Sequence, residues 1–151
     1  MKDNALPVAP SIAVATQTPR WRSQVQRGID SARPMPQVHW LLDFDSARNF
    51  IVSNECAALI VELPDGFSER PQQVLERVAD LCNNPQHCPL FLLAAPSADP
   101  WRAVLAEAGA TETCCSVLDF VKMWPRVERH LKTCLIGDLS VEEKVIARLP
   151  W

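Results

Sequence analysis

Glycine is scarce in this chain: there are four glycines in 151 residues, and they lie far apart. Both common Gly-rich phosphate-binding loops need closely spaced glycines, so nucleotide binding through either loop is excluded. No apolar run approaches the roughly 20 residues that a membrane-spanning helix needs. An excess of positive charge is also lacking, because 15 Lys and Arg stand against 18 Asp and Glu, for a net charge of -3. These absences argue against an integral membrane protein and against nucleic acid as the main partner.

The cysteines are expected to be reduced thiols, because no C-x-x-C pair is present. Three of the six lie in apolar runs typical of buried strands, where Cys behaves as a small hydrophobe: Cys56, Cys114 and Cys115. The nearby Cys82, His87 and Cys88 offer zinc ligands, but a fourth ligand is not evident. The first 15 residues carry an acidic side chain and two prolines, which makes a poor signal peptide. We therefore expect a cytoplasmic protein without a bound metal or cofactor.

What the chain does contain fits one globular domain, with 48% hydrophobic and 22% charged residues. From residue 11 onward, short apolar runs alternate with segments of helical period. The runs predict strands at 11–16, 37–42, 57–63, 89–95 and 113–117. Helices are expected to begin near Thr18, near Asp43 or Asp45, and near Ser68, Asp99 and Asp119. Gly109 should end the fourth helix, and Pro125 should kink the fifth or delay its start.

The strands at 57–63 and 89–95 are almost entirely apolar, so both faces of each are expected to be buried. Such strands occur in parallel sheets between two helix layers. The sequence therefore predicts a three-layer α/β/α domain over residues 11–132, with strand order 2-1-3-4-5 by analogy with flavodoxin-like folds. A flexible lead-in (1–10) should precede it, and a helical extension (133–151) should follow it.

The chain resembles the receiver domain of response regulators. The resemblance rests on the five strand–helix repeats, on Ala-Leu-Ile-Val-Glu-Leu-Pro at 58–64 and on Ala-Gly-Ala-Thr-Glu at 108–112. It covers about residues 11–132 and implies a flavodoxin-like fold. Active members use two acids after strand one to hold Mg²⁺ and an Asp ending strand three as phosphoryl acceptor. They also need a Ser or Thr ending strand four and a Lys ending strand five.

This chain departs from the receiver pattern at every one of those positions. The resemblance puts Thr16 and Gln17 at the acid pair, Glu62 at the acceptor, Ala94 at the hydroxyl and Ser116, within one residue, at the lysine. Mg²⁺ binds through carboxylates, and Thr16 and Gln17 supply no negative charge. Without the hydroxyl and the lysine, charge on a transferred phosphoryl group has little stabilisation. We therefore expect a degenerate, non-enzymatic receiver in which Glu62 either mimics a phosphorylated acceptor or simply faces solvent.

The start of the first helix offers a second possibility. Thr16, Thr18 and Arg20 lie where free backbone N–H groups favour an anion, the place of the flavin-phosphate loop in flavodoxin-like folds. Pro19 removes one donor, however, and Thr18 also fits an ordinary N-cap. A small-ligand or flavin-binding domain is therefore the second functional hypothesis.

Five tryptophans are more than a domain of this size buries comfortably, and aromatic residues are enriched at protein interfaces. The resemblance to receiver domains implies a partner surface on the last two domain helices. Together with the C-terminal tail, we expect this surface to contain Trp101, Phe120, Trp124 and Trp151. In the tail, Ser140 and Glu143 have capping-box spacing ahead of an apolar stripe. The first functional hypothesis is thus a non-catalytic interaction domain of cytoplasmic signalling, which binds a protein partner or a second copy of itself.

Overall fold

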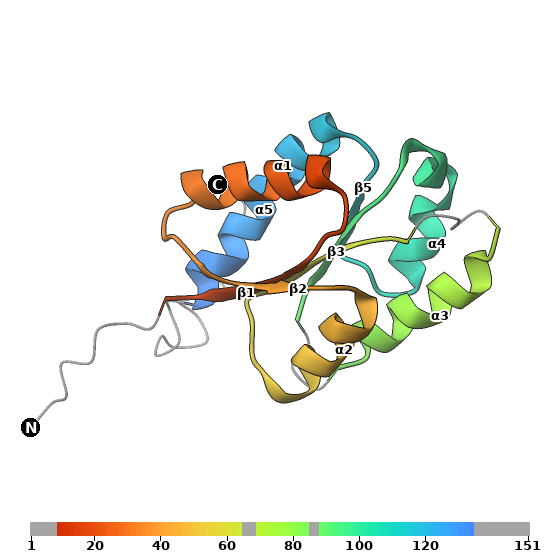
Figure 1. Cartoon of the computed structure of the whole chain (residues 1–151), viewed down its shortest axis with the longest axis horizontal. Coiled ribbons are helices and arrows are strands. Elements are labelled where there is room, and N and C mark those ends of the chain that lie inside the picture. Colours follow the sequence, from red (N-terminus) through yellow and green to blue (C-terminus); the bar gives the residue numbers. More distant parts are fainter. Residues whose placement is uncertain (1–8, 65–68, 85–87, 135–151) are drawn as a thin grey trace, which may run out of the picture.

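The computed structural model describes residues 9–64, 69–84 and 88–134 (Figure 1). Five parallel strands form one sheet in the order β2-β1-β3-β4-β5. The strands are β1 (Ser11–Ala15), β2 (Gln37–Leu41), β3 (Ala58–Glu62), β4 (Leu90–Leu93) and β5 (Glu112–Cys114). The predicted fold class and strand order are both confirmed. Trp151 and the expected tail after Cys134 lie outside the described residues, as does most of the expected lead-in.

Helices cover both faces of this sheet (Figure 1). One layer contains α1 (Pro19–Ser31) and α5 (Val117–Cys134), and the other contains α2 (Phe44–Ser53), α3 (Pro71–Cys82) and α4 (Arg102–Glu107). Side chains of a strand alternate between its two faces, so β1 contributes Ile12 and Val14 to one core cluster and Ala13 and Ala15 to the other. No helix among the described residues is long and apolar enough to cross a bilayer.

The segment after β4 differs from the expected helix that Asp99 would cap. A 3-10 helix runs from Pro96 to Trp101, and α4 begins only at Arg102. Asp99 does not cap it, because its carboxylate pairs with the Arg102 guanidinium at 2.6 Å. Gly109 does end the segment: its φ is 118°, and a Cβ there would lie 2.6 Å from Cys82 Cβ.

The last helix starts earlier than Asp119 and runs unbroken through Pro125. Ser116 allows this early start, because its hydroxyl accepts the Asp119 N–H at 3.2 Å and thus caps the helix. The helical period of this segment predicts an inward apolar stripe formed by Phe120, Val121, Trp124, Val127 and Leu131, and the structure differs at one of these positions. Val121 is 58% exposed, while Met123, one turn on from Phe120, is fully buried.

Candidate functional site

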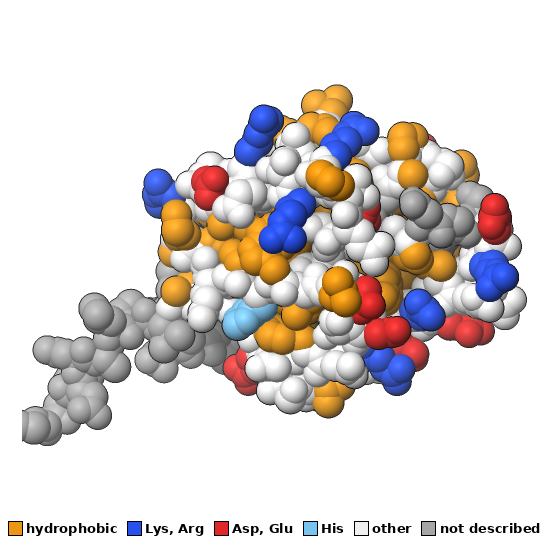
Figure 2. All heavy atoms as spheres, in the orientation of Figure 1, with side chains coloured by type: hydrophobic (Ala, Val, Ile, Leu, Met, Phe, Trp, Pro, Cys, Tyr) orange, Lys and Arg blue, Asp and Glu red, His pale blue; other side chains and the backbone are white. Residues whose placement is uncertain are grey.

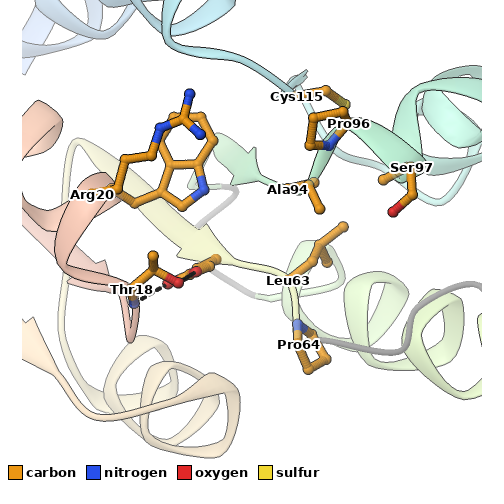
Figure 3. A pocket seen from close by; sticks show the side chains of 12 residues that line it. Thr18, Arg20, Leu63, Pro64, Ala94, Pro96, Ser97 and Cys115 are labelled. Atoms are coloured by element: carbon orange, nitrogen blue, oxygen red, sulfur yellow. Dashed lines mark hydrogen bonds between the residues drawn. The ribbon is translucent and has the colours of Figure 1, made fainter.

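A pocket of about 280 Å³ opens where β3 and β4 end and α1 begins (Figure 3). The carboxyl ends of parallel strands, where the strand order reverses, are the usual place for a site in such folds. Residues from four segments line it, among them Thr18, Arg20, Glu62, Pro64, Ala94 and Cys115. Four of these residues were singled out in the sequence. Thr18 and Arg20 were candidate anion ligands, Ala94 was the predicted hydroxyl position, and Glu62 was the predicted acceptor position.

The Glu62 carboxylate is bonded to the start of α1. Its Oε2 accepts the backbone N–H groups of Gln17 at 2.6 Å and Thr18 at 2.9 Å, and its Oε1 accepts the Thr18 hydroxyl. Dashed lines in Figure 3 mark the bonds at Thr18. A helix N-terminus favours negative charge through its unpaired N–H groups and its dipole. Glu62 therefore fills, from within the chain, the anion position that the sequence had suggested for an external ligand.

Thr18 has a different role from the ordinary N-cap that was expected. It stands at the N-cap position, but its side chain makes no capping hydrogen bond. Its hydroxyl points instead at Glu62, across to the end of β3 (Figure 3). Pro19 follows at the first helical position, where a missing N–H costs nothing. The turn between β1 and α1 thus presents its two N–H groups to one carboxylate.

The two positions predicted for the acid pair, Thr16 and Gln17, supply no charge. Thr16 is buried, and its hydroxyl has no hydrogen-bond partner among the described residues. Gln17 contributes its backbone N–H to Glu62, and its side chain is exposed. Among the described ranges, no three His, Cys, Asp or Glu side chains gather as a metal site. From the residues that the structure describes, a Mg²⁺ ion would therefore meet one carboxylate here, and that carboxylate already accepts hydrogen bonds.

The positions predicted for the hydroxyl and the lysine hold apolar or neutral side chains. Ala94 follows β4 and is 2% exposed, with no hydroxyl to offer. Cys115, rather than Ser116, lines the pocket after β5. Burial raises the pKa of the Cys115 thiol, so this side chain supplies neither a positive charge nor a ready thiolate. Ser116 caps α5 instead, a role that the S-x-x-D spacing with Asp119 indicates.

Arg20 is the cationic side chain on the pocket wall, and it is exposed. Its guanidinium points away from Thr18 in Figure 3. Arg102 lies beyond the pocket and bridges two elements, since it pairs with Asp99 and with Asp119 at the start of α5. Hydrogen bonds from the Cys115 N–H and from Arg102 hold the pKa of Asp119 below its usual value. Arg102 thus ties the start of α4 to the start of α5.

Two of the residues expected on the partner surface lie in the core. Phe120 and Trp124 are 3% and 7% exposed, with ring centroids 5.6 Å apart. The Trp124 indole N–H donates to Glu128 at 2.9 Å, so both the ring and its polar atom are already engaged. In this conformation neither residue is available to a partner. Trp101 is half-buried.

Other apolar side chains are exposed on α4 and α5. Leu118 is 62% exposed and Val121 58%, both on α5, and Val104 on α4 is 38% exposed. The Arg102–Asp119 ion pair lies between the starts of these helices. A second apolar region surrounds the β2 edge, where Figure 2 shows hydrophobic side chains gathered between α1 and α2. There the Arg22 guanidinium covers the half-buried Trp40 ring at 4.4 Å from its centroid.

The zinc ligands suggested by the sequence do not assemble among the described residues. Cys82 lies against Gly109, and His87 is outside the described ranges. Cys88 has a different neighbour, because its sulfur is 3.2 Å from that of Cys56. The sequence does not indicate this pair, since 32 positions separate the two cysteines.

No protein-family model matches this chain, and no curated protein matches it. Solved structures do. The CpaE2 pilus assembly protein of Sinorhizobium meliloti is 18% identical, with a TM-score of 0.61 over 78% of this chain and 98% of that chain. The receiver domain of the Francisella response regulator 1452 is 13% identical, with a TM-score of 0.61 over 82% of this chain and 97% of that one.

A third neighbour shows what the corresponding cleft holds in another protein. The receiver domain of the Pseudomonas aeruginosa sensor histidine kinase PA1611 has a magnesium ion in its active-site cleft. It is 15% identical, with a TM-score of 0.60 over 82% of this chain and 98% of that chain. Because the sequence identity is below 20% in each case, these similarities establish only the fold, and the fold is that of receiver domains.

Proposed function

We propose that this chain is a protein-interaction domain of cytoplasmic signalling that has kept the receiver fold and lost the receiver's phosphorylation chemistry. The same fold serves both a response regulator and a pilus assembly protein among its structural neighbours. The fold therefore leaves the pathway open, and the residues at the carboxyl end of the sheet carry the argument.

The engagement of Glu62 is the observation that carries the proposal. Its carboxylate accepts two backbone N–H groups and one hydroxyl from the start of α1. A phosphoryl acceptor must instead present a carboxylate oxygen to the incoming phosphorus, beside a cation that neutralises the transferred group. Glu62 fixes the β1–α1 turn against β3, so in this chain the acceptor position serves as a structural tie.

The apolar surface of α4 and α5 is the proposed contact region. Leu118 and Val121 stand out from α5, and Val104 stands out from α4. A protein interface has an apolar centre and a polar rim, and exposed aliphatic side chains beside an ion pair supply both kinds of surface. This surface replaces Phe120 and Trp124, which are buried, in the role expected from the sequence.

The phosphorylation half of the proposal is tested by intact mass. The purified chain is incubated with acetyl phosphate and Mg²⁺, and we expect no mass increase of one phosphoryl group. The matched variant Glu62→Asp restores the usual acceptor type alone, and it should also stay unmodified, because the acid pair and the lysine are still missing. A stoichiometric, Mg²⁺-dependent phosphoryl group on the unmutated chain would refute the proposal.

The interaction half is tested by placing negative charges on the apolar surface. The tagged chain is used to retain proteins from an extract of its own cells, and the variants Leu118→Glu and Val121→Glu should lose the retained partner. Val52→Glu is the matched control, because Val52 is 65% exposed on α2, in the other helix layer. Equal retention by all three variants, or a lone monomer with nothing retained, would contradict the proposed contact region.

The flavin-binding hypothesis has less support. A flavin phosphate at the start of α1 would need the N–H groups of Gln17 and Thr18, and both already bond to Glu62. We therefore expect the purified chain to be colourless, with no flavin absorbance in the visible range. A yellow preparation would favour the ligand-binding hypothesis over the interaction domain.

A further inference from the structure

We propose that Cys56 and Cys88 form a redox-active dithiol that exchanges with small-molecule disulfides and closes into an intramolecular disulfide. Their sulfur atoms are 3.2 Å apart. Cys56 stands two residues before β3 and Cys88 two residues before β4. The pair therefore lies at the amino end of the sheet, whereas Glu62 and its pocket lie at the carboxyl end. This inference is independent of the proposed function.

The backbone around Cys56 is held on both sides by the sheet. The N–H of Ala57 donates to the Ser11 carbonyl at 2.7 Å, and the N–H of Leu59 donates to the Pro89 carbonyl at 2.9 Å. The second bond joins the segment after Cys56 directly to the segment after Cys88. The closeness of the two thiols thus follows from the strand register, since β3 pairs with β4 from Leu59 onward.

Cys88 is positioned by a buried amide. Its N–H donates to the Asn84 side-chain oxygen at 3.3 Å, and the Asn84 amide donates in turn to the Leu81 carbonyl at 2.6 Å. Asn84 is 6% exposed, and a buried amide with both ends bonded is costly to move. The end of α3 therefore fixes Cys88 beside Cys56.

The two cysteines differ in the way that thiol exchange requires. Cys56 is half-buried and can be reached from solvent, while Cys88 is 7% exposed. A hydrogen bond from the Cys88 thiol lowers the pKa of Cys56, and the backbone N–H groups of Ala13 and Ala58 act in the same direction, against the effect of burial. Burial alone raises the pKa of Cys82 to about 11. The thiolate is the nucleophile in exchange, so Cys56 should react first.

The exchange balances with a disulfide RSSR as the oxidant. The Cys56 thiolate attacks one sulfur of RSSR and forms a mixed disulfide with it, while the S–S bond of RSSR breaks. One thiolate RS⁻ leaves and takes up a proton from solvent. Cys88 then loses its proton and attacks the Cys56 sulfur of the mixed disulfide, which expels the second RS⁻. The two cysteines lose two electrons and two protons, and RSSR becomes two molecules of RSH.

Closing this bond needs little movement. Bonded sulfurs lie about 2.05 Å apart, so the two atoms must approach by about 1.2 Å from their separation of 3.2 Å. The strand backbones carry the hydrogen bonds described above, and rotation of the two short side chains is the movement required. The product would clamp the beginnings of two central strands.

Incubation of the full chain with oxidised glutathione tests the proposal. The alkylated chain is digested without reductant, and we expect a linked peptide that contains Cys56 and Cys88. The oxidised chain should also melt at a higher temperature, by about 5–10 °C, because the bond restricts the unfolded state. Dithiothreitol should reverse both changes.

Single variants separate the roles of the two cysteines. In Cys88→Ser the mixed disulfide should persist on Cys56, because nothing resolves it, and in Cys56→Ser no bond to Cys88 should form. Cys82→Ser is the matched control, since Cys82 is also half-buried, and the linked peptide should appear as in the unmutated chain. Circular dichroism verifies that each variant folds. Unmodified Cys56 and Cys88 in the unmutated chain, under conditions that modify Cys82, would overturn the proposal whether or not the variants fold.

Discussion

Glu62 shows how a single carboxylate can take the place of a binding site. The sequence marked it as a degenerate acceptor, and it separately marked the start of the first helix as a place for an anion. Gln17 and Glu62 are 45 positions apart, and Thr18 and Glu62 are 44 apart. Local patterns do not link residues at such distances, so the two observations remained separate until the fold brought them together.

Removing this carboxylate should cost stability. In Glu62→Ala the N–H groups of Gln17 and Thr18 lose their acceptor, and we expect the free energy of unfolding to fall by about 1–2 kcal/mol, because the site is only half-buried. Glu62→Gln keeps an acceptor oxygen without the charge and should lose less. Urea unfolding measures both.

The exposed Glu55 offers the control for this experiment. It lies at the other end of the sheet, and Glu55→Ala should change the free energy of unfolding by less than about 0.5 kcal/mol. A Glu62→Ala chain as stable as the Glu55→Ala chain would show that the bonds to the start of α1 contribute nothing.

At the scale of helices and strands, the sequence predicted the order and type of the elements because each strand is a short apolar run. Errors arose where a local side-chain contact set a boundary. Asp99 pairs with Arg102 instead of capping a helix, and Ser116 caps α5 three residues before the expected start at Asp119. The inward stripe of α5 was right at Phe120, Trp124, Val127 and Leu131, and wrong at Val121.

The packing of α1 on α5 predicts whether Gly28→Ala raises or lowers the free energy of unfolding. A Cβ on Gly28 would lie 2.7 Å from two atoms of the Trp124 ring. Alanine is favoured over glycine by about 1 kcal/mol within a helix, so an unobstructed Gly28→Ala change would stabilise the chain. Because the ring is buried and bonded to Glu128, we expect a net loss of about 1–3 kcal/mol.

Thermal or urea unfolding decides between these outcomes. The control is Ser23→Ala, on the exposed side of the same helix, which should be neutral or slightly stabilising. If Gly28→Ala stabilised the chain as much as the control, the close contact between α1 and the Trp124 ring would be absent in solution.

For the molecule as a whole, lowering the pH should reduce the free energy of unfolding, because carboxylates in both helix layers have lowered pKa values. Hydrogen bonds from Ser46 lower the pKa of Asp43 at the start of α2, and the Cys115 N–H and Arg102 lower that of Asp119 in α5. The folded chain therefore releases these protons more readily than the unfolded chain does. Their contribution is fully present above the unfolded pKa of about 3.9, and it is lost as the pH falls through the lower folded values.

The variant Asp119→Asn tests this linkage. It should be less stable than the unmutated chain at pH 7, and the difference in unfolding free energy should shrink as the pH is lowered from about 5 towards 3. Glu107→Gln, an exposed change on α4, serves as the control. A difference that stays constant over this pH range would mean that Asp119 titrates alike in the folded and unfolded chains.

The candidate site could be predicted only in what depends on residue identity. The identities of Thr16, Gln17 and Ala94 led to the prediction that acids and a hydroxyl are missing from the receiver positions. The bonds of Glu62 to the helix start and the contact of Cys56 with Cys88 depend on strand register, and 32 or more positions separate their members. Sequence patterns report neighbours along the chain, whereas these pairs are neighbours across the sheet.

The hydrogen bonds between Glu62 and the start of α1 also set the concentration that a free anion must reach before it can displace the Glu62 carboxylate. A tethered group meets its site at an effective concentration of about millimolar or more, however dilute the protein. A free phosphate at lower concentration is outcompeted by a ligand that cannot diffuse away. Under the function proposed above, re-engineering this domain to respond to phosphorylation would therefore require removal of the Glu62 carboxylate before any metal-binding acids are added.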